Sequence, residues 1–461
     1  MYHAETLKDK IRLFLRILLP IMITQISLSA MNLVDTMMSG RVGTDDLAGV
    51  AIGASLWSPV FTGMNGIMLA ITPIIAQFMG ANERHKIHHT VTQAIFLSIA
   101  IGIAIILIGI VAVEPILNLM NLEENVKYIA LHYLVGLSIG IVPLFLSNVI
   151  RNFFDGQGFT RITMIITVLA VPFNVLLNYS LIFGHFGMPK LGGIGAGYAT
   201  GITFWIILII SIFMTFKIES VKEYKLFVKW LKPSMKAWKE QLAIGIPIGL
   251  SIFFEASIFS VVTLLIGNMF STIIIAANQI VISFTTLLFM VPLSLSMAIT
   301  IVVGYSIGGK RLDSAKQYSL IGVLGAVGFL ALGSIFMYFF REQIAYLYTS
   351  DPSVVLVAGQ LFIIAIIYQL SDASQASLQG VLRGYKDVKV PFYIAFAAYW
   401  LVGIPSGYLL AAFTSLGPAG FWVGITLGLT GAAIGFFIRL RIIYRKERAN
   451  LSMNGNKVVS E

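Results

Sequence analysis

Apolar runs of about twenty residues or more recur along the whole chain, separated by short polar links. A run of that length, folded as a helix, crosses the ~30 Å hydrocarbon core of a bilayer. Charged residues make up 11% of the chain and hydrophobic residues 57%, whereas charged residues are about a quarter of an average soluble protein. The sequence therefore predicts an all-α, polytopic membrane protein and excludes an ordinary soluble domain.

Twelve of these apolar segments are predicted to span the membrane. Their limits are residues 12–39, 47–78, 88–112, 127–151, 163–184, 194–217, 242–266, 275–306, 316–340, 353–381, 390–412 and 419–440. A charged link divides them six and six. We predict an N-terminal six-helix lobe at 1–217, a cytoplasmic basic linker at 218–241, a C-terminal six-helix lobe at 242–443 and a cytoplasmic tail at 444–461.

The positive charges indicate how the spans are oriented. With the N-terminus inside, all but four of the 31 Lys and Arg residues fall on the cytoplasmic side, as the positive-inside rule requires. The four exceptions are Arg41, Lys127, Lys190 and Arg341. We therefore expect a plasma (inner) membrane protein with both termini in the cytoplasm. The basic charge then reports topology and contact with membrane lipids, not nucleic-acid binding.

The two halves of the chain resemble each other. The segment LLPIMITQISLS (18–29) is similar to GIPIGLSIFFEA (245–256), with Pro20 matching Pro247, and three further pairs follow at nearly the same offset. Six spans return the chain to its starting side, so the repeats are parallel. We predict two lobes related by a pseudo-two-fold axis along the membrane normal, an arrangement typical of transporters that work by alternating access.

Three carboxylates, Asp35, Glu255 and Asp372, lie deep within predicted spans. No Lys or Arg is expected at comparable depth, and an unpaired ionised carboxylate in hydrocarbon costs several kcal/mol. Such an acid is protonated, holds a metal ion such as Na⁺, or faces a wet cavity that receives a cationic substrate. A protein that alternates among these states is a cation-coupled transporter.

Polar residues near the carboxylates predict a lined cavity. In the tenth span, Tyr368, Asp372, Gln375 and Gln379 form one helical stripe. The other candidates are Gln25 and Asn32 before Asp35, the pair Asn174 and Asn178 in the fifth span, and Ser251 one turn before Glu255. Taken singly, a membrane Asn, Gln or Ser more often joins helices than binds a ligand.

Several stretches together resemble the multidrug and toxic compound extrusion (MATE) family, specifically its bacterial NorM-like branch. They are LVDTMMSGRVGTDDLAGVA (33–51), ITPIIAQFMGA (71–81), FEAS (254–257), SDASQASLQGVLRGY (371–385) and two LG-x-x-G segments. The resemblance covers nearly the whole chain. It implies a non-enzymatic exporter of bulky, often cationic amphiphiles, driven by inward flow of Na⁺ or H⁺ and needing no cofactor; we expect a monomer.

The resemblance also implies roles for particular residues. Glu255 and Asp372, with Tyr368 nearby, match acids that bind the coupling cation in the C-terminal lobe. The polar cluster of the N-terminal lobe is matched by Asp35, Asn174 and Asn178. An acid within FFEAS favours Na⁺ at Glu255 and Asp372, because the H⁺-coupled DinF-like branch generally lacks it.

Two alternatives remain open on the sequence. A flippase for a lipid-linked precursor would need basic residues along its cavity to hold an anionic headgroup, and the spans show none. An intramembrane hydrolase using a carboxylate pair would leave the six-helix repeat unexplained. No nucleotide-binding loop is present, so direct use of ATP is not expected.

Overall fold

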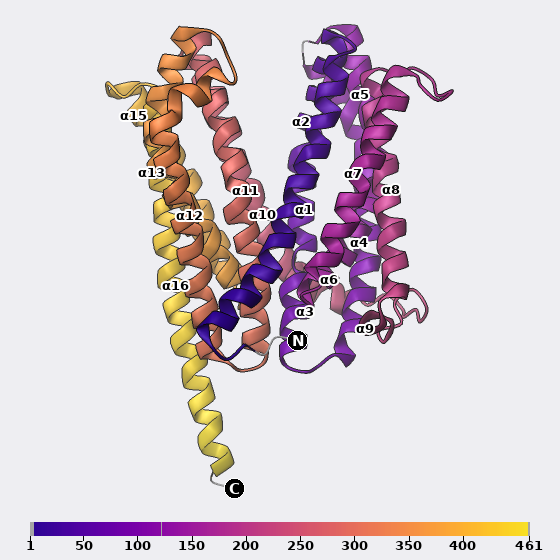
Figure 1. Ribbon diagram of the computed structural model, residues 1–461, viewed down its shortest axis with the longest axis vertical. Coiled ribbons are helices and arrows are strands. Elements are labelled where there is room, and N and C mark those ends of the chain that lie inside the picture. Colours follow the sequence, from indigo (N-terminus) through magenta and orange to yellow (C-terminus); the bar gives the residue numbers. More distant parts are fainter. Residues whose placement is uncertain (1–3, 121, 460–461) are drawn as a thin grey trace. The chain divides into compact units, whose positions relative to one another are not determined.

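A computed structural model describes residues 4–120 and 122–459, with side chains described as far as residue 450, and its described residues contain no strand (Figure 1). The helices are α1 Leu7–Gly40, α2 Thr44–Met68, α3 Ile71–Gly80, α4 His85–Leu119, α5 Glu124–Ser138, α6 Ile141–Gly156, α7 Thr160–Phe183, α8 Gly193–Lys217, α9 Glu219–Lys222, α10 Met235–Met269, α11 Thr272–Gly308, α12 Leu312–Tyr346, α13 Pro352–Gly384, α14 Lys389–Phe396, the π-helix η1 Ala397–Gly403, α15 Ile404–Phe413 and α16 Ala419–Val459.

The predicted membrane spans are present. Among the described residues, 11 helical segments are long and apolar enough to cross a bilayer, and the count reaches 12 when the bent pair α5 and α6 is taken as one span. The bend between these two helices is 49°. Each segment covers one of the twelve predicted runs, so the all-α, two-lobe polytopic fold is confirmed.

The chain divides into two compact units. The N-terminal unit comprises Leu19–Phe78 and Glu83–Ile246, and the C-terminal unit comprises Met1–Leu18, Met79–Asn82 and Pro247–Glu461. In each repeat the boundary between the units falls within the first span helix, close to the matched Pro20 or Pro247.

Hydrogen bonds explain why the beginning of α1 belongs with the C-terminal unit. The Lys10 ammonium donates to Gln317 Oε1 at 2.6 Å and to Ser314 Oγ at 3.1 Å, both on α12. Phe14 and Ile17, which follow on the same helix, are almost fully buried.

The basic linker packs within the N-terminal unit. Leu226 is buried, and the ring of Tyr224 meets the ring of Phe153 edge to face at 5.6 Å. The Tyr224 carbonyl contacts His88 Nδ1 at 2.6 Å, and Gln93 Nε2 donates to the Lys232 carbonyl at 2.9 Å. The predicted linker segment is therefore held by specific contacts.

Glycines bring α5 and α8 close together in the N-terminal unit. A side chain on Gly197 would overlap the Tyr133 carbonyl, and one on Gly201 would stand 2.7 Å from the Gly136 carbonyl. Small residues allow this close backbone approach in membrane helices. The consequence is that the polar face of α8 is held in a fixed position inside the unit.

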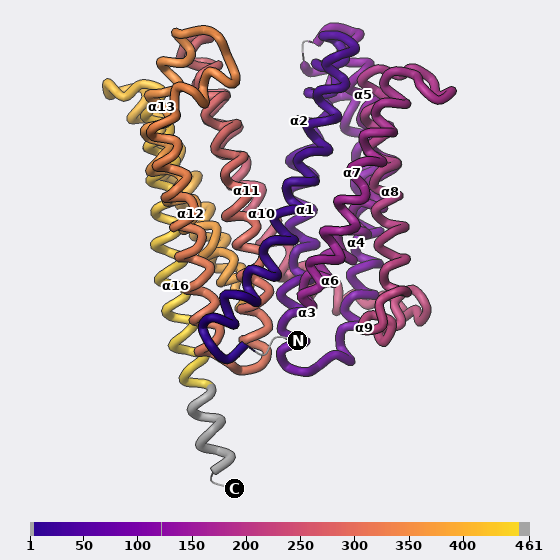
Figure 2. The backbone as a smooth tube through the Cα atoms, viewed as in Figure 1, coloured from indigo at the N-terminus to yellow at the C-terminus, as the bar shows by residue number. Residues whose placement is uncertain are grey.

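The C-terminal unit is organised around α13, which packs along α11, α12 and α16 (Figure 2). Helix α16 also packs against η1 and α15, and glycines allow this close approach. A side chain on Gly424 would overlap the backbone of Gly407, and one on Gly428 would stand 2.8 Å from the Ala398 carbonyl. This packing fixes the π-helix beside the centre of the unit.

The close approach of α16 to α15 predicts a large effect for one added methyl group. We expect Gly424→Ala to lower the free energy of unfolding by about 1–3 kcal/mol, the usual cost of overpacking, measured by thermal unfolding in detergent. The matched control is Gly328→Ala, because Gly328 is helical and has open space where its Cβ would lie. Equal unfolding temperatures for the two variants would contradict the packing argument.

Candidate functional site

The carboxylate of Asp35 is held at the centre of a polar cluster in the N-terminal unit. The Asp35 side chain is 5% exposed. Asn178 Nδ2 donates to Asp35 Oδ1 at 2.6 Å, and Thr200 Oγ1 donates to Asp35 Oδ2 at 2.5 Å. Asn174 Nδ2 is farther from Oδ1, at 3.5 Å. The structure thus brings together the three residues that the sequence singled out here and adds Thr200.

Three helices supply this cluster. Asp35 comes from α1, the two asparagines come from successive turns of α7, and Thr200 and Thr203 come from the glycine-packed face of α8. Thr203 Oγ1 accepts from Asn174 Nδ2 at 3.4 Å. The buried Asn178 Oδ1 has no hydrogen-bond partner among the described residues. The cluster therefore contains one oxygen with an unused lone pair beside a carboxylate.

The C-terminal unit holds two carboxylates joined by one amide. Gln375 Nε2 donates to Glu255 Oε1 at 2.7 Å and lies 3.4 Å from Asp372 Oδ1. Asp372 and Gln375 are buried on α13, and Glu255 is half-buried on α10. Because both acids contact the same amide group, two negative charges share a single nitrogen donor.

Two tyrosines complete this cluster. Tyr368 donates its hydroxyl to Asp372 Oδ2 at 3.1 Å, one turn before that acid on α13. Tyr399 donates to Gln375 Oε1 at 2.8 Å and thereby fixes which end of the amide faces the carboxylates. Tyr399 lies in η1, and wide turns of this kind often occur at functional positions. Both tyrosines are almost fully buried.

No Lys or Arg nitrogen lies within 4.0 Å of Asp35, Glu255 or Asp372 in the described part of the chain. One arginine nevertheless lies on the helix that carries Asp372, at its C-terminal end. The sequence placed Arg383 in a cytoplasmic link, but α13 continues through it and its side chain is 6% exposed. It donates to Gln379 Oε1 at 3.1 Å, so Gln379 pairs with this arginine.

The remaining predicted cavity residues lie outside both clusters. Asn32 is exposed and Gln25 is half-buried on α1. The hydroxyl of Ser251 is buried and donates to the Pro247 carbonyl on its own helix at 2.7 Å. A lining role for Gln25, Asn32 and Ser251 stays a prediction.

Three participants were missed by the sequence analysis: Thr200, Thr203 and Tyr399. Each is a single hydroxyl whose partner lies on another helix, so periodicity within one span does not reveal it. The available signals were indirect: the glycines before Thr200 that allow close packing, and Pro405 after η1, which removes a backbone donor and disturbs the helical ladder.

The two clusters offer oxygen ligands to a small hard cation. Carboxylate, amide and hydroxyl oxygens are the groups that hold such ions in proteins. In the N-terminal unit the donors are Asp35, Asn178 and Thr200. In the C-terminal unit they are Glu255, Asp372 and Tyr368. Either cluster could instead take up a proton on a carboxylate.

Known proteins are similar to this chain in sequence. The profile of the family described as MatE matches the chain twice, at residues 20–180 and 247–409. A relative in Halalkalibacterium halodurans, named "Probable multidrug resistance protein NorM", is 50% identical over 99% of this chain and 100% of its own length. One of the same name in Oceanobacillus iheyensis is 52% identical over 97% and 100%.

A solved structure has the same fold. It is described as the outward-facing conformation of a multidrug resistance MATE family transporter of the MOP superfamily. It matches with a TM-score of 0.85 at 20% identity, over 95% of this chain and 96% of that one. Because the family profile begins at Pro20 in one half and at Pro247 in the other, the two matches coincide with the internal repeat.

The bond from Tyr399 to Gln375 predicts a measurable loss of stability. We expect Tyr399→Phe to lower the free energy of unfolding by about 1–3 kcal/mol, because it leaves the buried Gln375 Oε1 without its donor. The measurement is thermal unfolding in detergent. Tyr393→Phe is the matched control, since Tyr393 lies on the preceding helix and is 67% exposed. A variant as stable as the wild type would mean that the bond contributes nothing.

Proposed function

The chain belongs to the MATE family, and on this basis we propose that it is a cation-coupled antiporter that exports bulky, often cationic amphiphilic drugs and toxins. The names of the relatives in Halalkalibacterium halodurans and Oceanobacillus iheyensis support the substrate class. The observation that carries the coupling is the Glu255–Gln375–Asp372 cluster, where two acids share one amide and have no Lys or Arg within ion-pair distance in the described chain.

This cluster favours binding of a cation on electrostatic grounds. Two ionised carboxylates close together in a low-dielectric environment repel each other, and the Gln375 amide supplies only a partial positive charge to offset this. A monovalent cation between them would remove most of that repulsion. We infer that the coupling ion binds here and that an empty cluster is the high-energy state of the cycle.

We favour Na⁺ over H⁺ as the coupling ion. Glu255, Asp372 and Tyr368 together present several oxygen atoms from two helices, and one proton needs only a single one of them. Rotation of the Gln375 amide would turn Oε1 toward the ion and Nε2 toward the Tyr399 hydroxyl, which can accept as well as donate a hydrogen bond. The hydrogen bonds around the site could thus rearrange between a state without a bound cation and a state with one.

Transport then follows from a difference in affinity between two access states. Substrate binds the state open to the cytoplasm and the cation binds the state open to the exterior, so each ligand shifts the population toward its own state. A ligand that bound both states equally would shift nothing. Exchange of one for the other across the membrane is antiport by alternating access.

The Asp35 cluster is proposed as a second cation or proton site. Its carboxylate already accepts two short hydrogen bonds, from Asn178 and Thr200, and is therefore better solvated by the protein than the acids of the C-terminal unit. The free Asn178 Oδ1 would be the additional ligand.

A flux measurement tests the coupling. We expect proteoliposomes preloaded with ethidium to release it when Na⁺ is added outside, and Glu255→Gln to reduce release to the level of empty liposomes. The matched control Glu342→Gln removes an exposed acid on α12 in the same unit and should transport normally. Normal Na⁺-driven release by Glu255→Gln would overturn the assignment, and release driven by a pH gradient alone would replace Na⁺ by H⁺.

Binding of Na⁺ can be separated from transport by thermal unfolding in detergent. We expect NaCl to stabilise the wild type relative to choline chloride, by about 2.7 kcal/mol at a hundredfold excess over the dissociation constant. Asp372→Asn and Glu255→Gln should lose most of this stabilisation, whereas Asp35→Asn should keep most of it, because the more tightly held ion is proposed to bind in the other unit. Equal stabilisation of all variants would place the ion elsewhere.

A further inference from the structure

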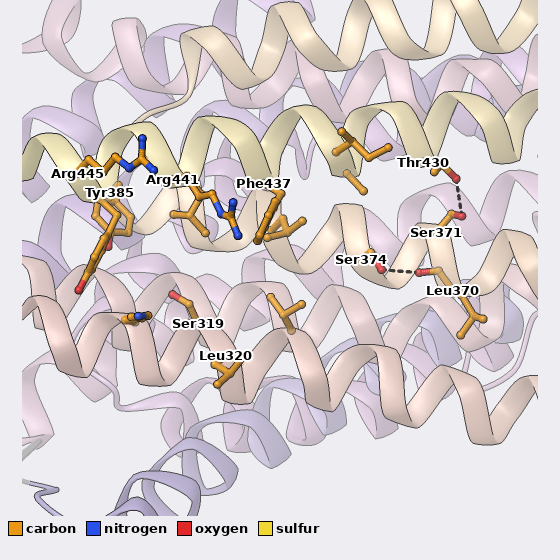
Figure 3. Close-up of a pocket in the computed structure, with 17 residues that line it drawn as sticks. Ser319, Leu320, Leu370, Ser371, Ser374, Tyr385, Thr430, Phe437, Arg441 and Arg445 are labelled. Atoms are coloured by element: carbon orange, nitrogen blue, oxygen red, sulfur yellow. Dashed lines mark hydrogen bonds between the residues drawn. The ribbon is translucent and has the colours of Figure 1, made fainter.

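A groove runs along the C-terminal unit over α13, with α12 and α16 as its walls (Figure 3). Its volume is about 790 Å³. Both walls pack against α13 but have little contact with each other, so the face of α13 between them is open. The groove is separate from the acidic cluster, none of whose residues line it.

The length of the groove corresponds to one leaflet of a bilayer. Its lining on α13 extends from Leu370 to Tyr385, which is roughly 22 Å at about 1.5 Å per residue. Half of a bilayer including its headgroup region is about 20–22 Å. The helices that form the groove are membrane spans, so its long axis lies along the direction of the acyl chains.

Most of this length is apolar. The walls and floor between the two ends include Leu320, Val323, Leu378, Ile434 and Phe437. The hydroxyls of Ser319 and Ser374 also line this part, and each donates to a carbonyl of its own helix. Leu320 and Ile434 are more than half exposed and stand on opposite walls. At the far end the hydroxyls of Ser371 and Thr430 satisfy each other in a hydrogen bond of 2.8 Å. An extended hydrocarbon chain could lie here without leaving a polar group unpaired.

The other end of the groove is basic. Lys316 comes from α12 and Arg441 and Arg445 come from α16, and in Figure 3 Arg445 lies beside Tyr385. None of the three has a carboxylate oxygen within 4.0 Å in the described chain. Instead the Arg441 guanidinium lies 4.5 Å from the centre of the Phe437 ring. All three side chains are exposed, so their charges are free to meet an anion.

The acids nearby form no ion pair with these three cations in the described chain. Asp387 pairs with Arg439 at 2.7 Å, and neither residue lines the groove. Asp313 accepts from the Tyr444 hydroxyl at 3.5 Å, and Glu447 lies one turn beyond that tyrosine; both acids also lie outside the lining. Arg439, which has an acid partner, is thus outside the groove. Arg441 and Arg445, which have none within ion-pair distance in the described chain, line its basic end.

We propose that this groove is a binding site for an anionic phospholipid of the cytoplasmic leaflet. One acyl chain lies against the apolar walls, and the phosphate is held by Lys316, Arg441 and Arg445, which suit it by charge and, for the arginines, by planar hydrogen-bonding geometry. The orientation predicted from the sequence places this basic end on the cytoplasmic side. The lipid thereby bridges α12 and α16, which have little contact of their own.

Native mass spectrometry of the detergent-purified full chain tests the site. The probes are phosphatidylglycerol and phosphatidylcholine with identical acyl chains. Each Lys or Arg near a membrane surface contributes about a fivefold preference for an anionic lipid, so three give a preference on the order of a hundredfold. We expect the wild type to prefer phosphatidylglycerol by about this factor; equal binding of the two lipids would overturn the proposal.

Variants separate this site from general surface charge. The triple substitution Lys316→Gln, Arg441→Gln and Arg445→Gln should abolish the preference, whereas removing three exposed lysines of the basic linker by Lys229→Gln, Lys236→Gln and Lys239→Gln should preserve it. A triple groove variant that keeps the wild-type preference would refute the site. Leu320→Trp, which narrows the groove and leaves its charges in place, should weaken binding of both lipids at least about tenfold, and unchanged binding would refute the apolar contact.

Two other occupants are distinguished by the same measurements. Competition by glycerol phosphate at the concentration that suffices for the whole lipid would mean that the basic end binds a free phosphate and the groove contributes nothing. A mass corresponding to two chains, lost in Leu320→Trp, would mean that the groove receives a second copy of the protein. Either result would overturn the lipid assignment.

Discussion

The cost of holding carboxylates inside a membrane-spanning fold governs this structure. An ionised acid in hydrocarbon costs several kcal/mol unless the protein replaces the water that it has lost. Around Asp35 the replacement comes from Asn178 and Thr200, and around Glu255 and Asp372 it comes chiefly from Gln375. These donors are neutral and not cationic, so a cluster whose acids are ionised is left with net negative charge, which a bound cation would offset.

The helix packing is what makes these donors available. Thr200 lies on α8 between Gly197 and Gly201, and both glycines pack against the backbone of α5. This packing holds the Thr200 hydroxyl beside Asp35. Tyr399 depends in the same way on Gly424 and Gly428, which hold α16 against the π-helix and its neighbour. The positions of the polar clusters therefore depend on the close contacts between helices. Loosening those contacts would displace the hydrogen-bond donors from the acids.

The sequence predicted the spans from physical patterns. Spacing also placed Asn174 and Asn178 on one helix face and Tyr368, Asp372 and Gln375 on one stripe, but that they group with Asp35 and Glu255 was implied by the family resemblance. Contacts that depend on tertiary packing could not be predicted. Thr200 and Tyr399 reach their partners from other helices, and Arg383 was assigned to a link because a charge near a span end does not reveal whether the helix continues through it.

The two clusters differ in hydrogen bonding, and the proposed mechanism gives them different tasks. Asp35 is one acid with two short hydrogen bonds, whereas Glu255 and Asp372 are two acids that share one amide, with one longer bond from Tyr368 to Asp372. Without a bound cation, the acids of the C-terminal unit have fewer short hydrogen bonds per carboxylate than Asp35. A bound cation would therefore stabilise them more, most of all if it contacts both acids at once. We infer that the C-terminal unit sets the affinity for the coupling ion, because its electrostatic deficit is the larger, and that Asp35 responds to protons or to a more weakly held ion.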